Sequence, residues 1–545
     1  MNFKTYERRN YLSIAEIAVI VALALVPLFV SFPYRVNIFL SWEGAYRMSQ
    51  GELPFRDFGT PLGGMYWVIP AIFFKLFGVK MITLVKAQVF INIISGLAFR
   101  SILKSMEVQP GTRFLSVLLY CLSFSFFNFW PWYNHTVIVY EFIALAFLLK
   151  AITREKSKWT IAWLVLAAFF TCCSFFTKQD AGAMAILLSF ALLVYTAWQE
   201  RRWKPLLIYA ASLAVIFMLF IVPFLKYGFG YWFNHGQAPH SARISLFEIV
   251  DEFFSGSQWI KFYLFLMLVL LVIRFAGWKQ LWQKKKEVLF LLLTVGILGE
   301  AAVFQVTSYI PPDNNIFFHS FAIAFILSQL ALLLPVNLNK LQVVGAFSLG
   351  IIVWWSSVYW KYIQRIAERA LPSSHATVSP TGENIVNKKT YAIAPKDTTD
   401  IPMSEWKFSG LKTFDKIYMP APTVDGIKRL MAMDVVKQKK PLKVLNMSEL
   451  TPLAAEIPFT LERGSEYPLW YHLGVGMFNK QAEMFEQKIA NHEYDLVIFE
   501  YIPSLNNFYP FRVRDSLLQH YNKVDSFMAP RRGDTKGTIE IYTPQ

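Results

Sequence analysis

Residues 34–80 hold the densest set of side chains that could do chemistry. The segment carries three carboxylates and three guanidinium groups among glycines and prolines, namely Glu43, Glu52, Asp57, Arg35, Arg47 and Arg56. Carboxylates can take up protons from reacting hydroxyls, and guanidinium groups bind anions such as phosphates. Long ordered loops of this kind are more often functional than plain connectors. The alternative is a solvated loop with local ion pairs, which the charges alone do not exclude.

Other polar groups follow apolar runs further along the chain. Lys178 and Asp180 stand directly after such a run. An ammonium group is a compact point charge that suits phosphate, although Lys178 could also be paired with Asp180. Asn134 and His135 follow an aromatic stretch, and His319 lies near the start of a late apolar run. Each histidine could equally be a structural side chain.

The composition places these groups beside a membrane. Of 545 residues, 55% are hydrophobic and only 17% are charged, whereas soluble domains carry about 25% charged residues. This chain cannot cover its apolar groups with its own polar surface, so a bilayer must solvate part of it. Disorder, a collagen-like fibre and a disulfide scaffold are excluded. The three cysteines, Cys121, Cys172 and Cys173, all fall in apolar runs and provide no metal-ligand spacing.

Eleven apolar runs are long enough to predict membrane spans. They lie near 12–33, 81–99, 114–130, 136–152, 159–176, 181–198, 205–225, 258–275, 287–306, 316–335 and 341–360. The piece at 64–78 is short and contains Pro70 and Lys75, which favours an interfacial or re-entrant helix.

The basic residues predict the orientation. The formal net charge is +16, and the first 360 residues hold 29 Lys and Arg against 16 Asp and Glu. Nineteen of those 29 cations fall in alternate connections, together with the N-terminal segment. The positive-inside rule then places the N-terminus in the cytoplasm and the C-terminal part outside. The excess charge is therefore a topology signal, and we expect no nucleic-acid partner.

The chain changes character after residue 360. Residues 361–400 are polar and read as a linker, and 401–545 contain the strand-like runs 442–446, 496–501 and 539–542 with a helical stretch at 477–491. The predicted fold is a polytopic α-helical membrane protein of about eleven spans over 1–360, with outer-face loop helices at 34–80. A small soluble α/β domain at 401–545 completes it on the outer face.

The first outer loop contains a series of short motifs: Trp42-Glu43-Gly44, 51–58 (GELPFRDF), 60–63 (TPLG), Tyr66-Trp67 and 75–78 (KLFG). With these motifs it resembles the first outer loop of the C-type integral-membrane glycosyltransferases, which include protein O-mannosyltransferases and the lipid A aminoarabinose transferase. In that superfamily a short acidic motif follows the first span, and an amphipathic stretch rich in Gly, Pro and aromatic residues comes next. Where the superfamily often has an acidic pair, this chain has Ser41-Trp42 before a single acid, Glu43.

The resemblance implies transfer of a sugar from a polyprenyl-phosphate carrier to a glycan, lipid or protein acceptor on the outer face. It implies a site at the membrane surface, and it favours a bacterial inner membrane with the C-terminal domain in the periplasm. Glu43 would be the catalytic base and Asp57 would support it. Arg56, Lys178 and His319 would bind the donor phosphate. Asn134, His135 and Asp180 would bind the acceptor or the sugar.

Several alternatives stay open. Glu43 could cap a helix beginning near Gly44, and Asp57 could be a partner of Arg56. The leaving phosphate could use a divalent metal such as Mg²⁺ or Mn²⁺, although the sequence fixes no cofactor. A transporter or flippase, a glycan polymerase or ligase, and a non-catalytic relative are the rival functions. A proton-coupled transporter would need charged groups in a series across the membrane, and only the scattered Lys86, Glu141 and Glu300 lie in or near spans, which counts against a transporter.

Overall fold

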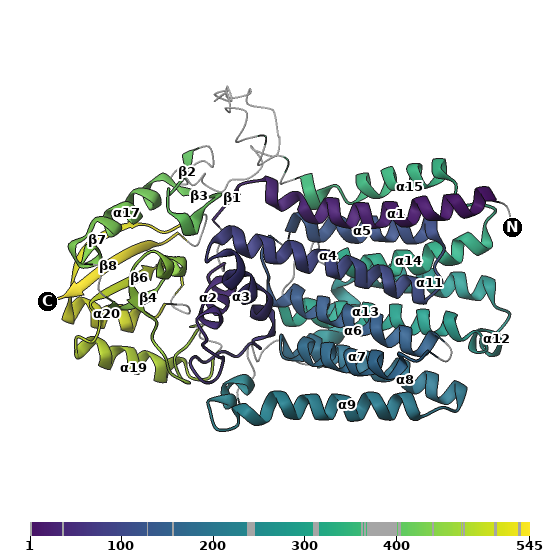
Figure 1. Cartoon of the computed structure of the whole chain (residues 1–545), viewed down its shortest axis with the longest axis horizontal. Helices are drawn as coiled ribbons and strands as arrows, with labels where there is room; N and C mark the ends of the chain where they lie inside the picture. The colour runs from purple at the N-terminus through teal and green to yellow at the C-terminus, as the bar shows by residue number, and fades with distance from the viewer. Residues whose placement is uncertain are drawn as a thin grey trace.

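The helical half of the molecule is a bundle whose helices run roughly parallel to one another (Figure 1). Each predicted apolar run lies on a helix. These helices are α1 (Phe3–Leu25), α4 (Met81–Ser105), α5 (Pro110–Phe127), α6 (Tyr133–Thr153), α7 (Thr160–Phe175), α8 (Gln179–Glu200), α9 (Lys204–Ile221), α11 (Gln258–Arg274), α13 (Lys285–Ser308), α14 (Ile316–Leu333) and α15 (Leu341–Trp354).

The computed structural model describes most of the chain. The residues outside the description are 1–2, 35–37, 128, 155–156, 237–245, 309–315, 361–400 apart from 363 and 367, 402–404, 439–440, 470, 472–474, 506–508 and 532–535. The predicted linker therefore lies outside the described residues, apart from those two positions. Side chains are also left undescribed at 3–10, 123–127, 235–236, 308 and 316.

Within the described residues, six helices are long and apolar enough to cross a membrane. The number rises to seven if Leu246–Gly256 and Gln258–Arg274, which meet at a bend of 75°, form one span. Helices such as α7, α14 and α15 are apolar but shorter. The existence of a helix at every predicted run is confirmed, whereas the total of eleven spans and their orientation stay predictions.

Short helices occupy the segment after α1. The chain forms α2 (Ile38–Ser49) and α3 (Met65–Phe77), which lie between the bundle and the sheet (Figure 1). Both helices fall within the predicted outer-loop range of 34–80. Two further short helices, α10 (Leu246–Asp251) and α12 (Trp278–Trp282), lie between the later long helices.

The C-terminal part is an α/β domain, as predicted. Its five-stranded mixed sheet has the order β5-β4-β6-β8-β7, with β4 parallel to β5 and β6 and the pairs at β8 antiparallel. The strands are β4 (Leu442–Met447), β5 (Phe459–Thr460), β6 (Leu496–Tyr501), β7 (Tyr521–Met528) and β8 (Thr538–Pro544). The accompanying helices are α17 (Ala421–Ala432), α18 (Asp434–Lys437), α19 (Phe478–Ala490) and α20 (Phe511–His520).

Backbone pairing ties the two halves together. The two-residue strand β1 (Phe32–Pro33), directly after α1, pairs in parallel with β3 (Ile417–Pro420), which also pairs with β2 (Trp406–Phe408). The buried Tyr34 donates a hydrogen bond to the Glu449 carbonyl of the α/β domain. The α/β domain is therefore fixed at the end of the bundle opposite the N-terminus (Figure 1).

Candidate active site between the helices and the α/β domain

Helix α2 presents Glu43 to the α/β domain. Its apolar residues Ile38, Phe39, Trp42 and Ala45 are buried, so packing on several sides holds this short helix in place. The helix ends where Gly51 takes a positive φ of 89°, a conformation that glycine adopts without steric cost. Because α2 begins at Ile38, Glu43 lies inside the helix, and the alternative that it caps a helix starting near Gly44 is wrong.

Glu43 belongs to a network of ion pairs that we call the Glu43 cluster: Glu43, Arg47, Glu52 and Arg463. Arg47 Nε donates to Glu43 Oε1 over 3.0 Å, and Arg47 Nη1 donates to Glu52 Oε2 over 2.8 Å. Arg463 donates to the other oxygen of Glu52 over 2.9 Å. Arg47 is 1% exposed, so this cation holds two carboxylates away from water.

The α/β domain completes the surroundings of Arg47. The guanidinium also donates to the Glu462 carbonyl over 2.8 Å, and its carbon lies 4.9 Å from the centre of the Tyr467 ring. On the other side it lies 5.7 Å from the centre of the Phe58 ring. Such cation–π contacts are stronger when water is excluded. The docked α/β domain therefore supplies part of the environment that buries Arg47.

Burial raises the pKa of Glu43, and the neighbouring Arg47 opposes that rise. A carboxylate with a raised pKa is a better proton acceptor at neutral pH, provided that it stays ionised. The small cavity beside Glu43 has a volume of about 30 Å³ and is lined by Phe39, Asn446 and Tyr467, among others. That volume suits a water molecule or two but no sugar. The α/β domain thus covers most of Glu43 and leaves its side chain 13% exposed.

Asp57 lies in the loop that follows α2 and has local partners. Its Oδ2 accepts from Arg56 Nη2 over 2.6 Å and from the Leu53 amide over 2.8 Å. The turn contains Phe55 at a φ of 67°, which is rare for an aromatic residue and is held by a hydrogen bond from the Phe55 amide to the Phe58 carbonyl. The alternative that Asp57 pairs with Arg56 is thus realised. Arg56 itself is 36% exposed.

A second group of charges, the Lys178 cluster, consists of Lys178, Asp180, Glu141 and Glu300. Lys178 Nζ donates to Asp180 Oδ2 over 2.7 Å and lies 4.6 Å from the centre of the Phe304 ring. Glu141 of α6 and Glu300 of α13 are buried deeper in the bundle, where their carboxyl groups lie close enough to interact electrostatically. Within the described part of the chain, their carboxyl oxygens have no hydrogen-bond partner. Tertiary packing thus adds Glu141 and Glu300 to the predicted pair.

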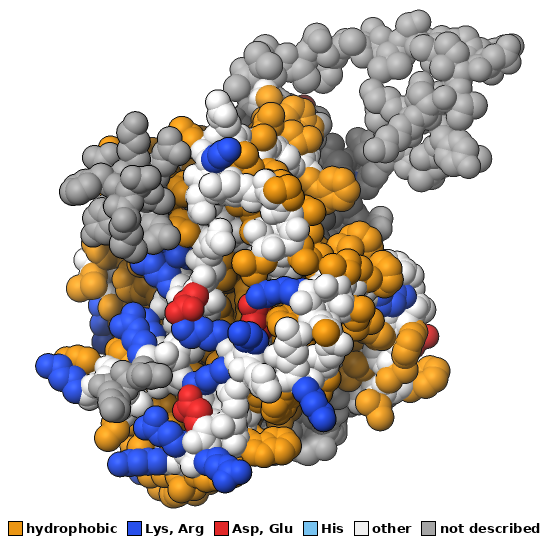
Figure 2. All heavy atoms as spheres, turned by 90° about the vertical axis from the view of Figure 1, so that its right-hand side faces the viewer, with side chains coloured by type: hydrophobic (Ala, Val, Ile, Leu, Met, Phe, Trp, Pro, Cys, Tyr) orange, Lys and Arg blue, Asp and Glu red, His pale blue; other side chains and the backbone are white. Residues whose placement is uncertain are grey.

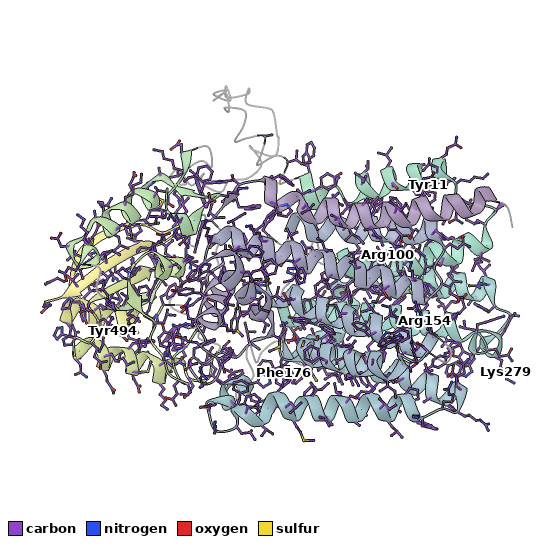
Figure 3. All side chains as sticks on the ribbon, viewed as in Figure 1. Tyr11, Arg100, Arg154, Phe176, Lys279 and Tyr494 are labelled. Atoms are coloured by element: carbon purple, nitrogen blue, oxygen red, sulfur yellow. The ribbon has the colours of Figure 1, made fainter. Side chains whose placement is uncertain are left out.

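The segment that joins α2 to α3 is attached to the turn that presents Lys178. The amides of Gly63 and Met65 donate to the carbonyls of Thr177 and Phe176, each over 3.2 Å. A Cβ placed on Gly63 would lie 1.6 Å from the Phe176 oxygen, so this contact requires a glycine. Phe176 lies at the end of the bundle nearest the α/β domain (Figure 3). Among the described contacts, no hydrogen bond or ion pair joins Glu43 directly to Lys178.

The remaining predicted residues lie on two helices, α6 and α14. Asn134 and His135 stand in the first turn of α6, and within the described part of the chain Asn134 Oδ1 and His135 Nδ1 have no hydrogen-bond partner. His319 of α14 shares a hydrogen bond of 2.8 Å with the Tyr263 hydroxyl and lies against Trp259 at 4.2 Å between ring centres. This aromatic setting suits a structural histidine, and no described contact brings His319 to Lys178.

The donor set in this region does not fit a divalent cation. Glu43, Glu52 and Asp57 each accept hydrogen bonds from arginine, so their negative charge is already balanced. Across the described residues, no group of three or more His, Cys, Asp or Glu side chains could hold a metal ion. We therefore derive no step through Mg²⁺ or Mn²⁺.

Sequence reasoning missed the contribution of the α/β domain. Glu462, Arg463 and Tyr467 lie some 400 residues after α2 and carry no motif. The proximity of Glu141 to Glu300 was equally invisible, although both residues stand out as charges within apolar runs. A buried charge needs a partner, and that rule was the available signal.

Comparison with known proteins gives structural likenesses only. No family model matches the chain, and no curated protein matches it in sequence. ArnT from Cupriavidus metallidurans in the apo state gives a TM-score of 0.49 at 12% identity over 97% of both chains. ArnT bound to undecaprenyl phosphate gives 0.45 at the same identity and coverage. AglB, an oligosaccharyltransferase from Archaeoglobus fulgidus solved with an inhibitory peptide and a dolichol-phosphate, gives 0.37 at 12% identity over 68% of this chain and 59% of its own.

The resemblance predicted from the first outer loop is to this same superfamily. At 12% identity and TM-scores below 0.5, these structures carry no argument about the site of this chain. The site is argued from the residues themselves.

Proposed function

We propose that this protein is a membrane glycosyltransferase of the C-type superfamily, which takes a sugar from a polyprenyl-phosphate carrier on the face where the α/β domain lies. The observation that carries the proposal is the attachment of the segment after α2, the helix that bears Glu43, to the Lys178 turn through the Gly63 and Met65 amides. A carboxylate and an ammonium group are thereby held on adjoining elements at one end of the bundle. Transfer from a lipid phosphate needs both groups.

In the proposed reaction, the acceptor hydroxyl oxygen attacks the anomeric carbon while its proton passes to the Glu43 carboxylate. The bond between the anomeric carbon and the carrier phosphate breaks, and its electron pair stays on the phosphate oxygen. Lys178 balances the charge that develops there. One displacement of this kind inverts the anomeric configuration. Asp57 holds the loop through Arg56 and supports the position of Glu43.

The α/β domain covers most of Glu43, and in this proposal the domain moves to admit an acceptor. The Glu43 cluster would open when Arg47 parts from the Glu462 carbonyl, which lies in that domain. The open form would then admit the acceptor, and the closed form would carry out transfer with water excluded. We include in this proposal a location in the bacterial inner membrane with the α/β domain in the periplasm. The basic connections lie at the opposite end of the bundle, which favours a cytoplasmic position for that end.

The experiment separates donor binding from chemistry. The full-length chain is purified in detergent, and two quantities are measured: affinity for undecaprenyl phosphate, and transfer from a panel of sugar-linked polyprenyl phosphates, with products identified by mass spectrometry. Lys178→Met should weaken carrier binding, and Lys178→Arg should restore part of it because the charge is kept. Glu43→Gln should bind the carrier normally and abolish transfer.

The exposed Lys75 of α3 provides the matched control. Lys75→Met removes the same charge from the same face of the bundle and should leave both quantities unchanged. Full transfer by Glu43→Gln, or carrier binding by Lys178→Met equal to that of the Lys75→Met control, would refute the assignment.

A transporter or flippase is the second candidate, and the proximity of Glu141 to Glu300 favours it. Two buried carboxyl groups that take up and release a proton inside a bundle could couple proton movement to transport. Reconstituted vesicles distinguish the two functions. Movement of a lipid-linked substrate without any glycosyl product, lost in Glu141→Gln, would support transport and overturn the transferase proposal.

A further inference from the structure

The end of the bundle remote from the α/β domain carries many basic side chains. Figure 2 views this end directly and shows Lys and Arg spread over the face, with few acidic residues among them. Arg100, Arg154 and Lys279 all lie toward this end (Figure 3). The positive-inside rule explains why cations gather here, but it does not require them to line a cavity.

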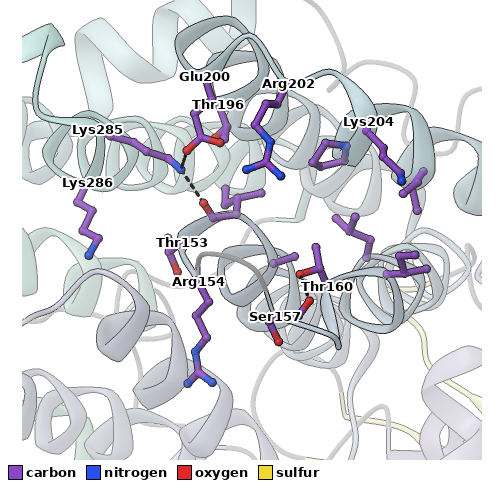
Figure 4. A pocket seen from close by; sticks show the side chains of 16 residues that line it. Thr153, Arg154, Ser157, Thr160, Thr196, Glu200, Arg202, Lys204, Lys285 and Lys286 are labelled. Atoms are coloured by element: carbon purple, nitrogen blue, oxygen red, sulfur yellow. Dashed lines mark hydrogen bonds and ion pairs between the residues drawn. The ribbon is translucent and has the colours of Figure 1, made fainter.

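Two adjoining cavities open among these cations. The first has a volume of about 380 Å³ and lies between the α6–α7, α8–α9 and α12–α13 connections (Figure 4). The second has a volume of about 420 Å³ and lies against the end of α4. Both cavities are lined by Thr153, Arg154 and Lys286, so they form one basic pocket.

The charges that line the basic pocket are unbalanced. It has eight cationic residues, Arg100, Lys104, Lys150, Arg154, Arg202, Lys204, Lys285 and Lys286. Its two carboxylates, Glu107 and Glu200, are already paired with Lys286 and Lys285. Among the described side chains, no carboxylate lies within ion-pair distance of Arg154, Arg202 or Lys204. The adjacent Glu155 and Lys156 lie outside the described residues and add no net charge.

Three helices begin at this pocket and add to its positive potential. They are α7 at Thr160, α9 at Lys204 and α13 at Lys285. A helix N-terminus carries a partial positive charge and favours an acidic residue in its first turn. The first turns of α7 and α9 contain no acidic residue, and α9 begins with a lysine. An anion bound there would be stabilised by both N-termini.

The surroundings of the pocket indicate that its anion is part of a lipid. Ile161 lines the cavity and is itself 56% exposed. Trp159 and Trp203, each beside the start of a helix, are also exposed, and the exposed Leu207 follows on α9. Exposed tryptophans at helix ends mark the level of lipid headgroups. An apolar wall at that depth suits acyl chains, whereas a soluble phosphate would gain nothing from it.

We propose that the basic pocket binds the phosphate headgroup of an anionic phospholipid, at a site separate from the one that holds Glu43 and Lys178. Arg154 and Arg202 bind the phosphate oxygens, and Ser157, which lines the same cavity, can donate a hydrogen bond. The acyl chains lie along Ile161 and the outer faces of α7 and α9. Bound lipid bridges the α6–α7, α8–α9 and α12–α13 connections and so holds these helices together. Basic pockets between membrane helices are suited to such headgroups.

The test titrates the purified full-length chain in neutral detergent with cardiolipin, phosphatidylglycerol, phosphatidylcholine and inorganic phosphate. Bound lipid is counted by native mass spectrometry, and affinity is taken from the rise in Tm. The two anionic lipids should bind, and phosphatidylcholine and inorganic phosphate should not. The double variant Arg154→Gln/Arg202→Gln should bind the anionic lipids about thirtyfold more weakly, since each cation at a headgroup contributes a factor of about five.

Two further variants keep the test decisive. Lys279→Gln removes an exposed cation from the same end that does not line the pocket, and it should bind like the wild type. Lys204→Gln alone should weaken binding of the anionic lipids about fivefold. This single variant provides the affinity measurement if the double variant does not fold. Equal binding of phosphatidylcholine would overturn the proposal. So would wild-type affinity in the pocket variants, or saturation by inorganic phosphate alone.

Discussion

Replacing Arg47 with methionine tests whether the Glu43 cluster holds the α/β domain on the bundle. Methionine keeps much of the side-chain volume but removes the charge and the donors. The change would leave Glu43 buried without a cation, because its described ion pair is with Arg47. Glu52 would keep Arg463. The Glu462 carbonyl would lose the donor that links the two domains.

The expected cost follows from burial. Removing one partner from a buried ion pair destabilises a protein by about 3–5 kcal/mol, because the remaining charge is left without compensation. Arg463 provides the matched control, since it binds the same Glu52 but is 61% exposed. Exposed pairs contribute about 0–1 kcal/mol, so Arg463→Met should have a small effect. The two variants therefore compare a buried arginine with an exposed one, both of which bind the same carboxylate, Glu52.

The assay is unfolding of the purified chain in detergent, followed by tryptophan fluorescence during heating at several pH values. Loss of Arg47 should raise the pKa of Glu43 further, because the group that opposes the effect of burial is gone. A raised carboxyl pKa means that the folded state binds the extra proton. The destabilisation should therefore be smaller at acidic pH, where only the lost bonds to Glu52 and the Glu462 carbonyl remain, and it should grow as the pH rises through that pKa.

A double variant completes the test. Arg47→Met/Glu43→Gln has no buried charge at position 43 and should recover part of the lost Tm. The reasoning is refuted if Arg47→Met and Arg463→Met lower Tm equally. It is also refuted if the deficit of Arg47→Met is independent of pH and is not relieved by Glu43→Gln.

Two further predictions concern the loop between the clusters. Gly63→Ala should lower Tm and expression sharply, since its Cβ would lie 1.6 Å from the Phe176 oxygen, whereas Gly345→Ala in α15 meets nothing within 4 Å and should be neutral or slightly stabilising. Similar behaviour of the two variants in a melting assay would contradict the described contact. Burial alone would raise the pKa of Asp57, but hydrogen bonds from Arg56 and a backbone amide outweigh that effect, so the pKa is lowered. The resulting stability is present above the ordinary carboxyl range and lost as the pH falls through the lowered pKa, so Asp57→Asn should flatten the acidic part of a pH–Tm profile. An unchanged profile would show that Asp57 has no such role.

The positions of helices and strands could be predicted from sequence because each depends on local pattern. Apolar runs identified every long helix, and short β-rich runs identified β4, β6 and β8. The bilayer requirement makes hydropathy a strong signal. The same signal does not fix the number of spans, because helices such as α7 and α15 are apolar but short.

The candidate site could be predicted only in part. Glu43 and Asp57 stood out as acids in a long outer loop, and Lys178 as a cation directly after an apolar run; their roles stay predictions. Their partners were identifiable only where they lie close in sequence, as Arg56 does for Asp57 and Asp180 does for Lys178.

The sequence by itself determined that the protein is a membrane helix bundle with an α/β domain, because hydropathy and charge act locally along the chain. Tertiary structure alone decided that Arg47 joins Glu43 to Glu462 and that Glu141 lies close to Glu300. Those contacts unite residues up to 415 positions apart. A buried charge demands a partner without specifying which one, and only packing supplies the answer.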